Sequence, residues 1–223
     1  MDQSASVELL GSRKVMYGFL RQIFLEGPTE EVLGLVRGCE LSIGGGKLPT
    51  GSSDEHLRES LTREFNRLFI GPGRVPASLY ESVYRSPSRL LMQESTVEVR
   101  RAYLEAGLVM QRLGSVPDDH LGAELEFMYY LSARAAAEAA HSRWEEADRY
   151  LTLGLAFLKG HLLSWVGEFS EDVLQATEDQ FFRGLVMLLV EFLSEDLEFL
   201  QEVCGQGCGS SAFPGYSASA VVV

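Results

Sequence analysis

The polar residues whose types could support chemistry gather in one short segment, from Pro117 to Glu124. Asp118, Asp119 and His120 follow the proline, and Glu124 lies four residues after the histidine. Proline and aspartate are typical of a helix N-terminus, because proline pre-sets the backbone and aspartate caps free N–H groups. Residues four apart share a helical face, so we expect His120 and Glu124 to lie together at the border of the core. A carboxylate at that border must find a hydrogen-bond partner or stay protonated.

Three interpretations of this segment are open from the residues alone. The first is a structural helix cap whose histidine is satisfied by hydrogen bonds. The second is a binding groove for a cationic ligand. The third is a metal or acid–base site on Asp119, His120 and Glu124, although a His-x3-Glu spacing alone is not diagnostic. The sequence contains neither a G-x-S-x-G nor an H-E-x-x-H motif that would indicate hydrolysis.

A second candidate segment combines aromatic side chains with one carboxylate and no nucleophile. The Gly-Pro-Gly turn at 71–73 leads into a stretch in which Tyr80 and Tyr84 flank Glu81 and Ser82. Exposed loops seldom carry such aromatic residues without a packing or binding use. The segment is therefore either a binding surface or a proline-rich crossover that is pinned into the core.

Two weaker motifs do not support a cofactor site. A glycine run at 44–46 precedes Lys47, but Leu48 stands where a phosphate-binding loop needs Ser or Thr. Cys204 and Cys208 are spaced one residue wider than the common zinc hairpin, with no histidine nearby in sequence. We therefore expect exposed thiols in the tail and no bound metal or cofactor. Three cysteines in total offer no disulfide framework, which favours a reducing compartment.

Apolar residues recur at helical spacing along most of the chain, whereas alternating strand patterns are nearly absent. This periodicity predicts an all-α fold, a single globular bundle of about seven to ten helices. We expect helices over 7–26, 29–38, 54–70, 95–113, 117–140, 145–165 and 171–203, the last as one helix or two. The predicted organisation is a helical domain over 1–203, with a loop at 42–53 and a crossover at 71–91, and a Gly-, Ser- and Ala-rich tail over 204–223.

The charge balance restricts the classes of partner. The 223 residues carry 32 acidic and 19 basic side chains, which gives a net charge of -13. Nucleic acid and anionic lipid would be repelled by this surface, so we expect partners that carry positive charge. The first residues, Met-Asp-Gln, are acidic rather than basic as in a secretory signal, and the apolar runs are far shorter than the roughly 20 residues of a membrane helix. These features predict a cytoplasmic protein without stable membrane insertion.

Taken in order, the two candidate segments resemble the TorD/DmsD family of redox-enzyme maturation chaperones. That family pairs an L-F-x-G-P-G element, followed by P-Y-E-S-x-Y, with a later D-H-x-x-x-E-L-x-F-M helix. Here the first element spans 64–84, with Leu79 in place of a second proline, and the second spans 117–128. A weaker third signature spans 157–165, and the similarity covers residues 12–200.

The resemblance implies an all-helical cytoplasmic chaperone that is not an enzyme. Such proteins bind the twin-arginine signal peptide on the catalytic subunit of a molybdenum oxidoreductase. They delay its export until the molybdopterin cofactor has been inserted. The expected peptide-binding residues are Tyr80, Glu81, Ser82, Tyr84, Asp118, Asp119, His120, Glu124 and Phe127. The chain could act as a monomer or as a homodimer.

The chemistry of these residues agrees with a peptide receptor. A twin-arginine peptide offers two guanidinium groups followed by an apolar stretch, and guanidinium pairs bidentately with carboxylate. Its receptor therefore needs carboxylates, such as Asp119 and Glu124, beside apolar walls, such as Leu79 and Phe127. Two alternatives remain: an all-helical assembly protein without signal-peptide specificity, and a metal-dependent hydrolase. An acidic series near the C-terminus, between Glu191 and Glu202, is expected to be a solvated helix face.

Overall fold

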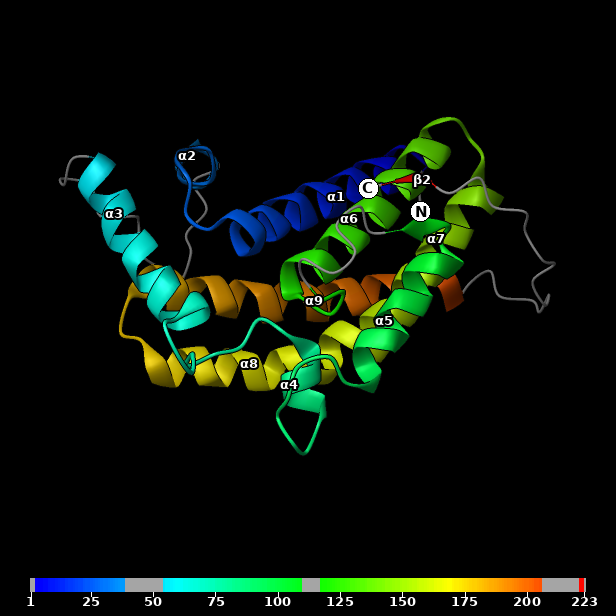
Figure 1. The fold of residues 1–223 in the computed structure, drawn as a ribbon. Helices are drawn as coiled ribbons and strands as arrows, with labels where there is room; N and C mark the ends of the chain where they lie inside the picture. Colours follow the sequence, from blue (N-terminus) through cyan, green and yellow to red (C-terminus); the bar gives the residue numbers. More distant parts are fainter. Residues whose placement is uncertain (1–2, 39–53, 110–116, 206–220, 223) are drawn as a thin grey trace.

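The structure is a computed structural model that describes residues 3–38, 54–109, 117–205 and 221–222 (Figure 1). The helices are α1 (Gln3–Glu26), α2 (Glu30–Gly38), α3 (Asp54–Phe65), α4 (Glu81–Arg85), α5 (Glu94–Glu105), α6 (Leu121–Ala140), α7 (Trp144–Phe157), α8 (Leu163–Ala176) and α9 (Gln180–Gly205). Two π-helical turns, Asn66–Ile70 and Leu158–Leu162, follow α3 and α7. Two short strands, β1 (Leu108–Val109) and β2 (Val221–Val222), pair in parallel. The prediction of an all-α bundle is confirmed.

Helix α6 packs along α1 and, on its other side, against α7 (Figure 1). Its first turn contains Gly122, where an added Cβ would lie 2.6 Å from Cγ of Leu25 in α1. A glycine at this position lets α1 approach the α6 backbone closely. The close packing fixes the turn of α6 that carries the sequence motif around His120.

The π-helical turn after α3 is anchored in an aromatic core. Phe65 and Phe69 lie 5.0 Å apart, and Phe69 packs 5.9 Å from Phe169 of α8 and 6.1 Å from Phe182 of α9. The crossover that follows is tied to this core, because Ala77 is fully buried. The N–H of Ala77 also donates a hydrogen bond to the backbone oxygen of Leu68 in the π-helical turn. The chain after the Gly-Pro-Gly turn is therefore held in place up to the start of α4.

Several predicted boundaries are wrong for local reasons. The crossover contains the short helix α4, and α5 ends at Glu105 because Gly107 takes a positive φ of 77°. The helix expected to start at Pro117 begins only at Leu121. The helix expected over 145–165 is also wrong at its end, because α7 ends at Phe157 and α8 runs through the predicted gap at 166–170. The region 171–203, expected as one helix or two, holds the end of α8 and then α9, which starts afresh because Asp179 accepts a hydrogen bond from Phe181 N–H.

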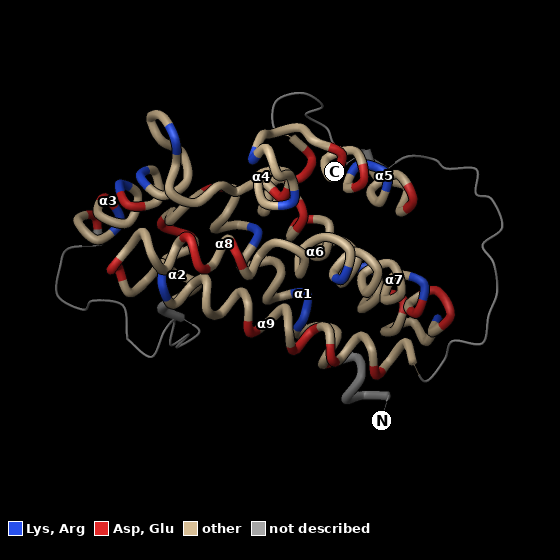
Figure 2. Tube along the Cα trace, turned by 90° about the horizontal axis from the view of Figure 1, so that it is seen from below, with Lys and Arg blue, Asp and Glu red and all other residues tan. Residues whose placement is uncertain are grey.

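Helix α9 carries acidic residues at intervals along its length (Figure 2). Glu191, Glu195, Glu198 and Glu202 are exposed, as a solvated face requires. Asp196 belongs to the same series but is buried against α1, so the prediction is wrong at that position.

Cys204 is also buried, at the end of α9, which corrects the expectation of an exposed thiol there. Cys39, Cys208, the loop at 42–53 and most of the predicted tail lie outside the described residues. None of the described helices is both long enough and apolar enough to cross a membrane.

Candidate functional site

The two sequence motifs, about forty residues apart, meet through their backbones. Tyr80 and His120 form an isolated antiparallel bridge. Beside it, Leu121 N–H donates to the backbone oxygen of Leu79 at 2.7 Å, and Glu81 N–H donates to that of Asp119 at 3.0 Å. The N-termini of α4 and α6 are thereby held against each other.

Four buried carboxyl groups gather at this meeting point, and we call them the acidic junction: Glu81, Asp118, Asp119 and Glu124. Each is at most 2% exposed. Burying so many carboxyl groups together is costly unless each is paired, hydrogen-bonded or protonated. The junction combines ion pairs, hydrogen bonds and, at Glu124, a raised pKa that favours the neutral form.

Asp119 connects the two motifs through its side chain. Its Oδ2 accepts a hydrogen bond from Ser82 N–H at 2.8 Å, and so it caps the N-terminus of α4 from another part of the chain. Its Oδ1 and the hydroxyl of Ser82 are buried and have no hydrogen-bond partner among the described residues. The junction therefore retains polar capacity that its own side chains do not use.

Glu81 and Glu124 are neighbouring buried carboxyl groups that influence each other. Glu81 accepts hydrogen bonds from Arg85 at 2.6 Å and from Nδ1 of His161 at 3.1 Å. Glu124 accepts one from the indole N–H of Trp165 at 3.2 Å. Burial, together with the neighbouring charge of Glu81, raises the pKa of Glu124 well above its usual range. This shift favours the protonated form of Glu124, which can donate a hydrogen bond to Glu81.

His120 is the N-cap residue of α6. Its Nδ1 accepts a hydrogen bond from Gly122 N–H at 3.1 Å, so the ring is neutral in this geometry. Burial lowers the pKa of His120 to about 4, although the nearby carboxylate of Asp119 opposes that shift. Its ring packs edge-to-face on Tyr80 at 5.1 Å. A cap with a satisfied histidine, the first interpretation of this segment, describes His120 in the structure.

Asp118 extends the junction toward α5. Its carboxylate pairs with Arg100, and its backbone oxygen accepts a hydrogen bond from the Tyr103 hydroxyl at 3.0 Å. The Tyr103 ring lies 4.7 Å from that of Phe127, which continues to Phe157 at 4.7 Å. This row of aromatic rings joins α5, α6 and α7 beneath the surface.

The expected site residues thus differ in how accessible they are. Tyr80 and Tyr84 are half-buried, with Tyr84 stacked on Trp165 at 5.4 Å. Leu79 and Phe127, expected as apolar walls, are buried, and Phe127 also lines a pocket. Sequence reasoning missed His161 and Arg85, although His161 lies within the weaker third signature. Among the described residues, no three His, Cys, Asp or Glu side chains are grouped so as to hold a metal ion.

Comparison with known proteins places this arrangement in a family. A family model described as "Nitrate reductase delta subunit" matches residues 35–171, which include both motifs. A "Chaperone protein TorD" of Aliivibrio fischeri is 27% identical over 154 residues, 69% of this chain and 70% of that protein. A "Probable Tat proofreading chaperone DmsD" of Haemophilus influenzae is 25% identical over 146 residues, 66% of this chain and 64% of that protein.

A "Tat proofreading chaperone DmsD" of Salmonella typhi is 29% identical over 133 residues, 60% of this chain and 58% of that protein. The chain thus spans less than two thirds of the length of these two DmsD relatives. The family match agrees with the all-helical fold and with the joining of the two motifs. The chain therefore belongs to the TorD/DmsD family, which confirms the resemblance and the prediction of a chaperone rather than an enzyme.

Proposed function

We propose that this protein is a cytoplasmic chaperone that binds the twin-arginine signal peptide of a molybdenum oxidoreductase's catalytic subunit. It delays export of that subunit until the molybdopterin cofactor has been inserted. The names of the DmsD relatives, which include Tat proofreading, support a signal peptide as the ligand. The net charge of -13 supports a basic segment as the part recognised, because opposite charge accelerates encounter.

One observation carries the proposal: the acidic junction buries four carboxyl groups, and ion pairs with described residues reach only two of them. Glu81 pairs with the guanidinium of Arg85 and binds His161, and Asp118 pairs with the guanidinium of Arg100. Asp119 and Glu124 are buried and form no ion pair with a described residue. An uncompensated buried charge is weakly screened by solvent and so attracts a cation at the surface above it.

The buried carboxylates act on the peptide indirectly, through their electrostatic field and through the contact residues that they hold in place. The half-buried aromatic side chains can contact the peptide directly. Tyr80 lies over the junction, and burial together with the charge of Asp119 raises the pKa of its phenol. It therefore stays a neutral donor with an aromatic face that a guanidinium can approach. Asp119, by capping α4, sets where that face lies.

Titration calorimetry with the full chain tests the function. The ligands are a synthetic twin-arginine signal peptide of a molybdoenzyme and its Lys-Lys counterpart. We expect the Arg-Arg peptide to bind at least about tenfold more tightly, since lysine cannot reproduce the bidentate fork of arginine. Equal binding of both peptides would assign the affinity to the apolar stretch. Absence of binding to either peptide by the folded chain would overturn the proposal.

A further inference from the structure

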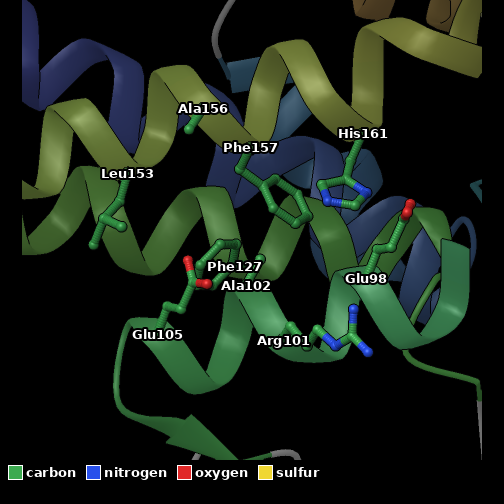
Figure 3. Close-up of a pocket in the computed structure, with 9 residues that line it drawn as sticks. All are labelled: Glu98, Arg101, Ala102, Glu105, Phe127, Leu153, Ala156, Phe157 and His161. Carbon is green, nitrogen blue, oxygen red and sulfur yellow. The ribbon is translucent and has the colours of Figure 1, made fainter.

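A pocket of about 290 Å³ opens beside the acidic junction, between α5, α6 and α7 (Figure 3). Its lining residues are Glu98, Arg101, Ala102, Glu105, Phe127, Leu153, Ala156, Phe157 and His161, and we call it the α5 pocket. Phe127 and Phe157 are almost fully buried, so only parts of their rings form its floor. A cavity of this size suits one or two side chains rather than a complete small-molecule ligand.

The rim of the α5 pocket is charged, and its charges come from one face of α5. Glu98, Arg101 and Glu105 are spaced by three and four residues, so they share that face. Figure 3 shows Glu98 near His161 and Glu105 near Phe127, at opposite ends of the pocket. The two carboxylates are separated by about 10 Å of helix rise. The Glu98 side chain is 40% exposed, so an incoming group can reach it.

Two side chains connect this pocket with the acidic junction. His161 lines the pocket and, through Nδ1, binds Glu81 at 3.1 Å. Arg85 donates to Glu81 at 2.6 Å and also to Glu98 at 3.2 Å. A second cavity of about 230 Å³ shares Glu98 and extends the same face of α5 toward Glu94. The pocket and this extension are thus adjacent along α5, and Arg85 and His161 connect them with the buried junction.

We propose that the α5 pocket is the subsite for the two peptide arginines, one guanidinium pairing with Glu98 and the other with Glu105. This inference rests on the proposed function and adds the residues that set specificity. A guanidinium can pair bidentately with a carboxylate at the rim while its methylene groups lie on the apolar floor, whereas an ammonium group cannot form the bidentate pair. The guanidinium at Glu98 competes with Arg85 for that carboxylate, and Arg101 opposes binding by charge.

The opposite charges of the glutamates and of Arg101 on this face of α5 provide the test. Calorimetric titration of the Arg-Arg peptide is repeated with Glu98→Gln, Glu105→Gln and Arg101→Gln. We expect each glutamate substitution to weaken binding about three- to tenfold, and Arg101→Gln to strengthen it about twofold. The matched control is Glu195→Gln on the exposed face of α9, which makes the same charge change elsewhere and is expected to leave affinity within about twofold.

A steric variant tests the pocket without changing charge. Ala156 is exposed at its edge, so Ala156→Trp is expected to fold normally and to block entry, with a loss of about tenfold or more in affinity. Circular dichroism confirms that each variant keeps its helical content.

The outcomes separate the two proposals. If wild-type chain binds the Arg-Arg peptide while the variants at Glu98, Glu105 and Ala156 bind like the control, the subsite is misplaced and the proposed function survives. If Arg101→Gln weakens binding and Glu98→Gln strengthens it, the pocket holds a different, non-cationic group. If the wild-type chain binds no peptide, the proposed function fails first.

Discussion

Two regions of this protein bury carboxylates, and the two regions differ in how these groups are paired and hydrogen-bonded. Between α1 and α9, Asp196 is a single carboxylate that Arg13 and Tyr17 enclose: Arg13 donates twice, once at 3.1 Å, and the Tyr17 hydroxyl donates at 2.7 Å. The acidic junction instead gathers four carboxyl groups, raises the pKa of one of them, Glu124, and leaves Oδ1 of Asp119 without a donor among the described residues.

The difference separates a structural from a functional use of buried charge. Both oxygens of Asp196 are satisfied, so that site ties two helices together and has no charge left to offer. In the junction, by contrast, the carboxyl groups of Asp119 and Glu124 form no ion pair with a described residue, and such clusters of buried carboxyl groups with perturbed pKa values are common at binding and catalytic sites. We therefore expect changes in the first region to affect stability alone, and changes in the second to affect peptide binding as well.

The largest effect is expected from Asp196→Ala. It leaves the buried guanidinium of Arg13 without its carboxylate, which lowers the free energy of unfolding by about 3–5 kcal/mol. Urea denaturation measures the loss, and calorimetry on the folded fraction is expected to give unchanged peptide affinity. Glu195→Ala, one residue away and exposed, is the control and should change stability by less than about 0.5 kcal/mol. A loss of affinity in Asp196→Ala would contradict the division between the regions.

The next largest effect is the loss of protein stability at acid pH, to which His120 contributes. Its pKa is lowered to about 4 by burial, whereas the unfolded chain takes up this proton near pH 6.5. Its contribution to stability is therefore complete above pH 6.5 and is lost as pH falls toward 4.

The variant His120→Asn keeps an N-cap acceptor and removes the titration. Between pH 6.5 and 4 the wild-type chain should lose about 2–3 kcal/mol relative to this variant, as measured by urea denaturation across pH. Parallel stability curves for the two proteins would show that His120 does not stay neutral in the folded state.

A smaller effect on stability, but a clearer one on binding, is expected at Asp119. Asp119→Ala removes the acceptor for Ser82 N–H and should lower stability by about 1–2 kcal/mol. Asp119→Asn retains an acceptor and removes the charge, so stability should change by less than about 1 kcal/mol. Both variants should weaken binding of the Arg-Arg peptide about three- to tenfold. If the asparagine variant binds like wild type, Asp119 contributes position and not charge.

The smallest change in the free energy of unfolding, measured at pH 5, is expected for Glu124→Gln. Glutamine resembles the protonated carboxyl group, since it can accept from Trp165 and donate to Glu81. At pH 5 its stability should lie within about 1 kcal/mol of wild type. Because the pKa of Glu124 is raised in the folded state, the wild-type chain should lose stability relative to the variant as pH rises above 5. A pH-independent difference would mean that Glu124 is ionised in the fold.

The sequence was sufficient to predict most of the helices, though not all of their boundaries, and the residues of the junction, because these depend on local signals. Helical periodicity predicted the bundle, and the His120–Glu124 spacing predicted a carboxyl group at the edge of the core that is paired or protonated. Asp119 was recognised as a capping residue, but it caps α4 rather than its own helix. That contact depends on how two distant segments meet, which spacing along the chain does not encode.

Long-range contacts also explain the other differences. Asp196 reads as part of an exposed acidic face, and only its contact with Arg13 of α1 shows why it is buried. Glu98 and Glu105 read as ordinary surface residues of a helix, and they become candidates only because α6 and α7 place aromatic rings beside them. Helical periodicity reports which face is buried, but not which helix covers it.

The most direct test of the account compares the preference for arginine over lysine in wild type and in Glu98→Gln. Dissociation constants for the Arg-Arg and Lys-Lys peptides are measured by calorimetry with both proteins. We predict a ratio of about tenfold or more for the wild-type chain, and a clearly smaller ratio for the variant, because the carboxylate that distinguishes the two side chains has been removed. A ratio near one in the wild-type chain would contradict recognition of the arginine pair, and an undiminished ratio in Glu98→Gln would contradict its placement at the α5 pocket.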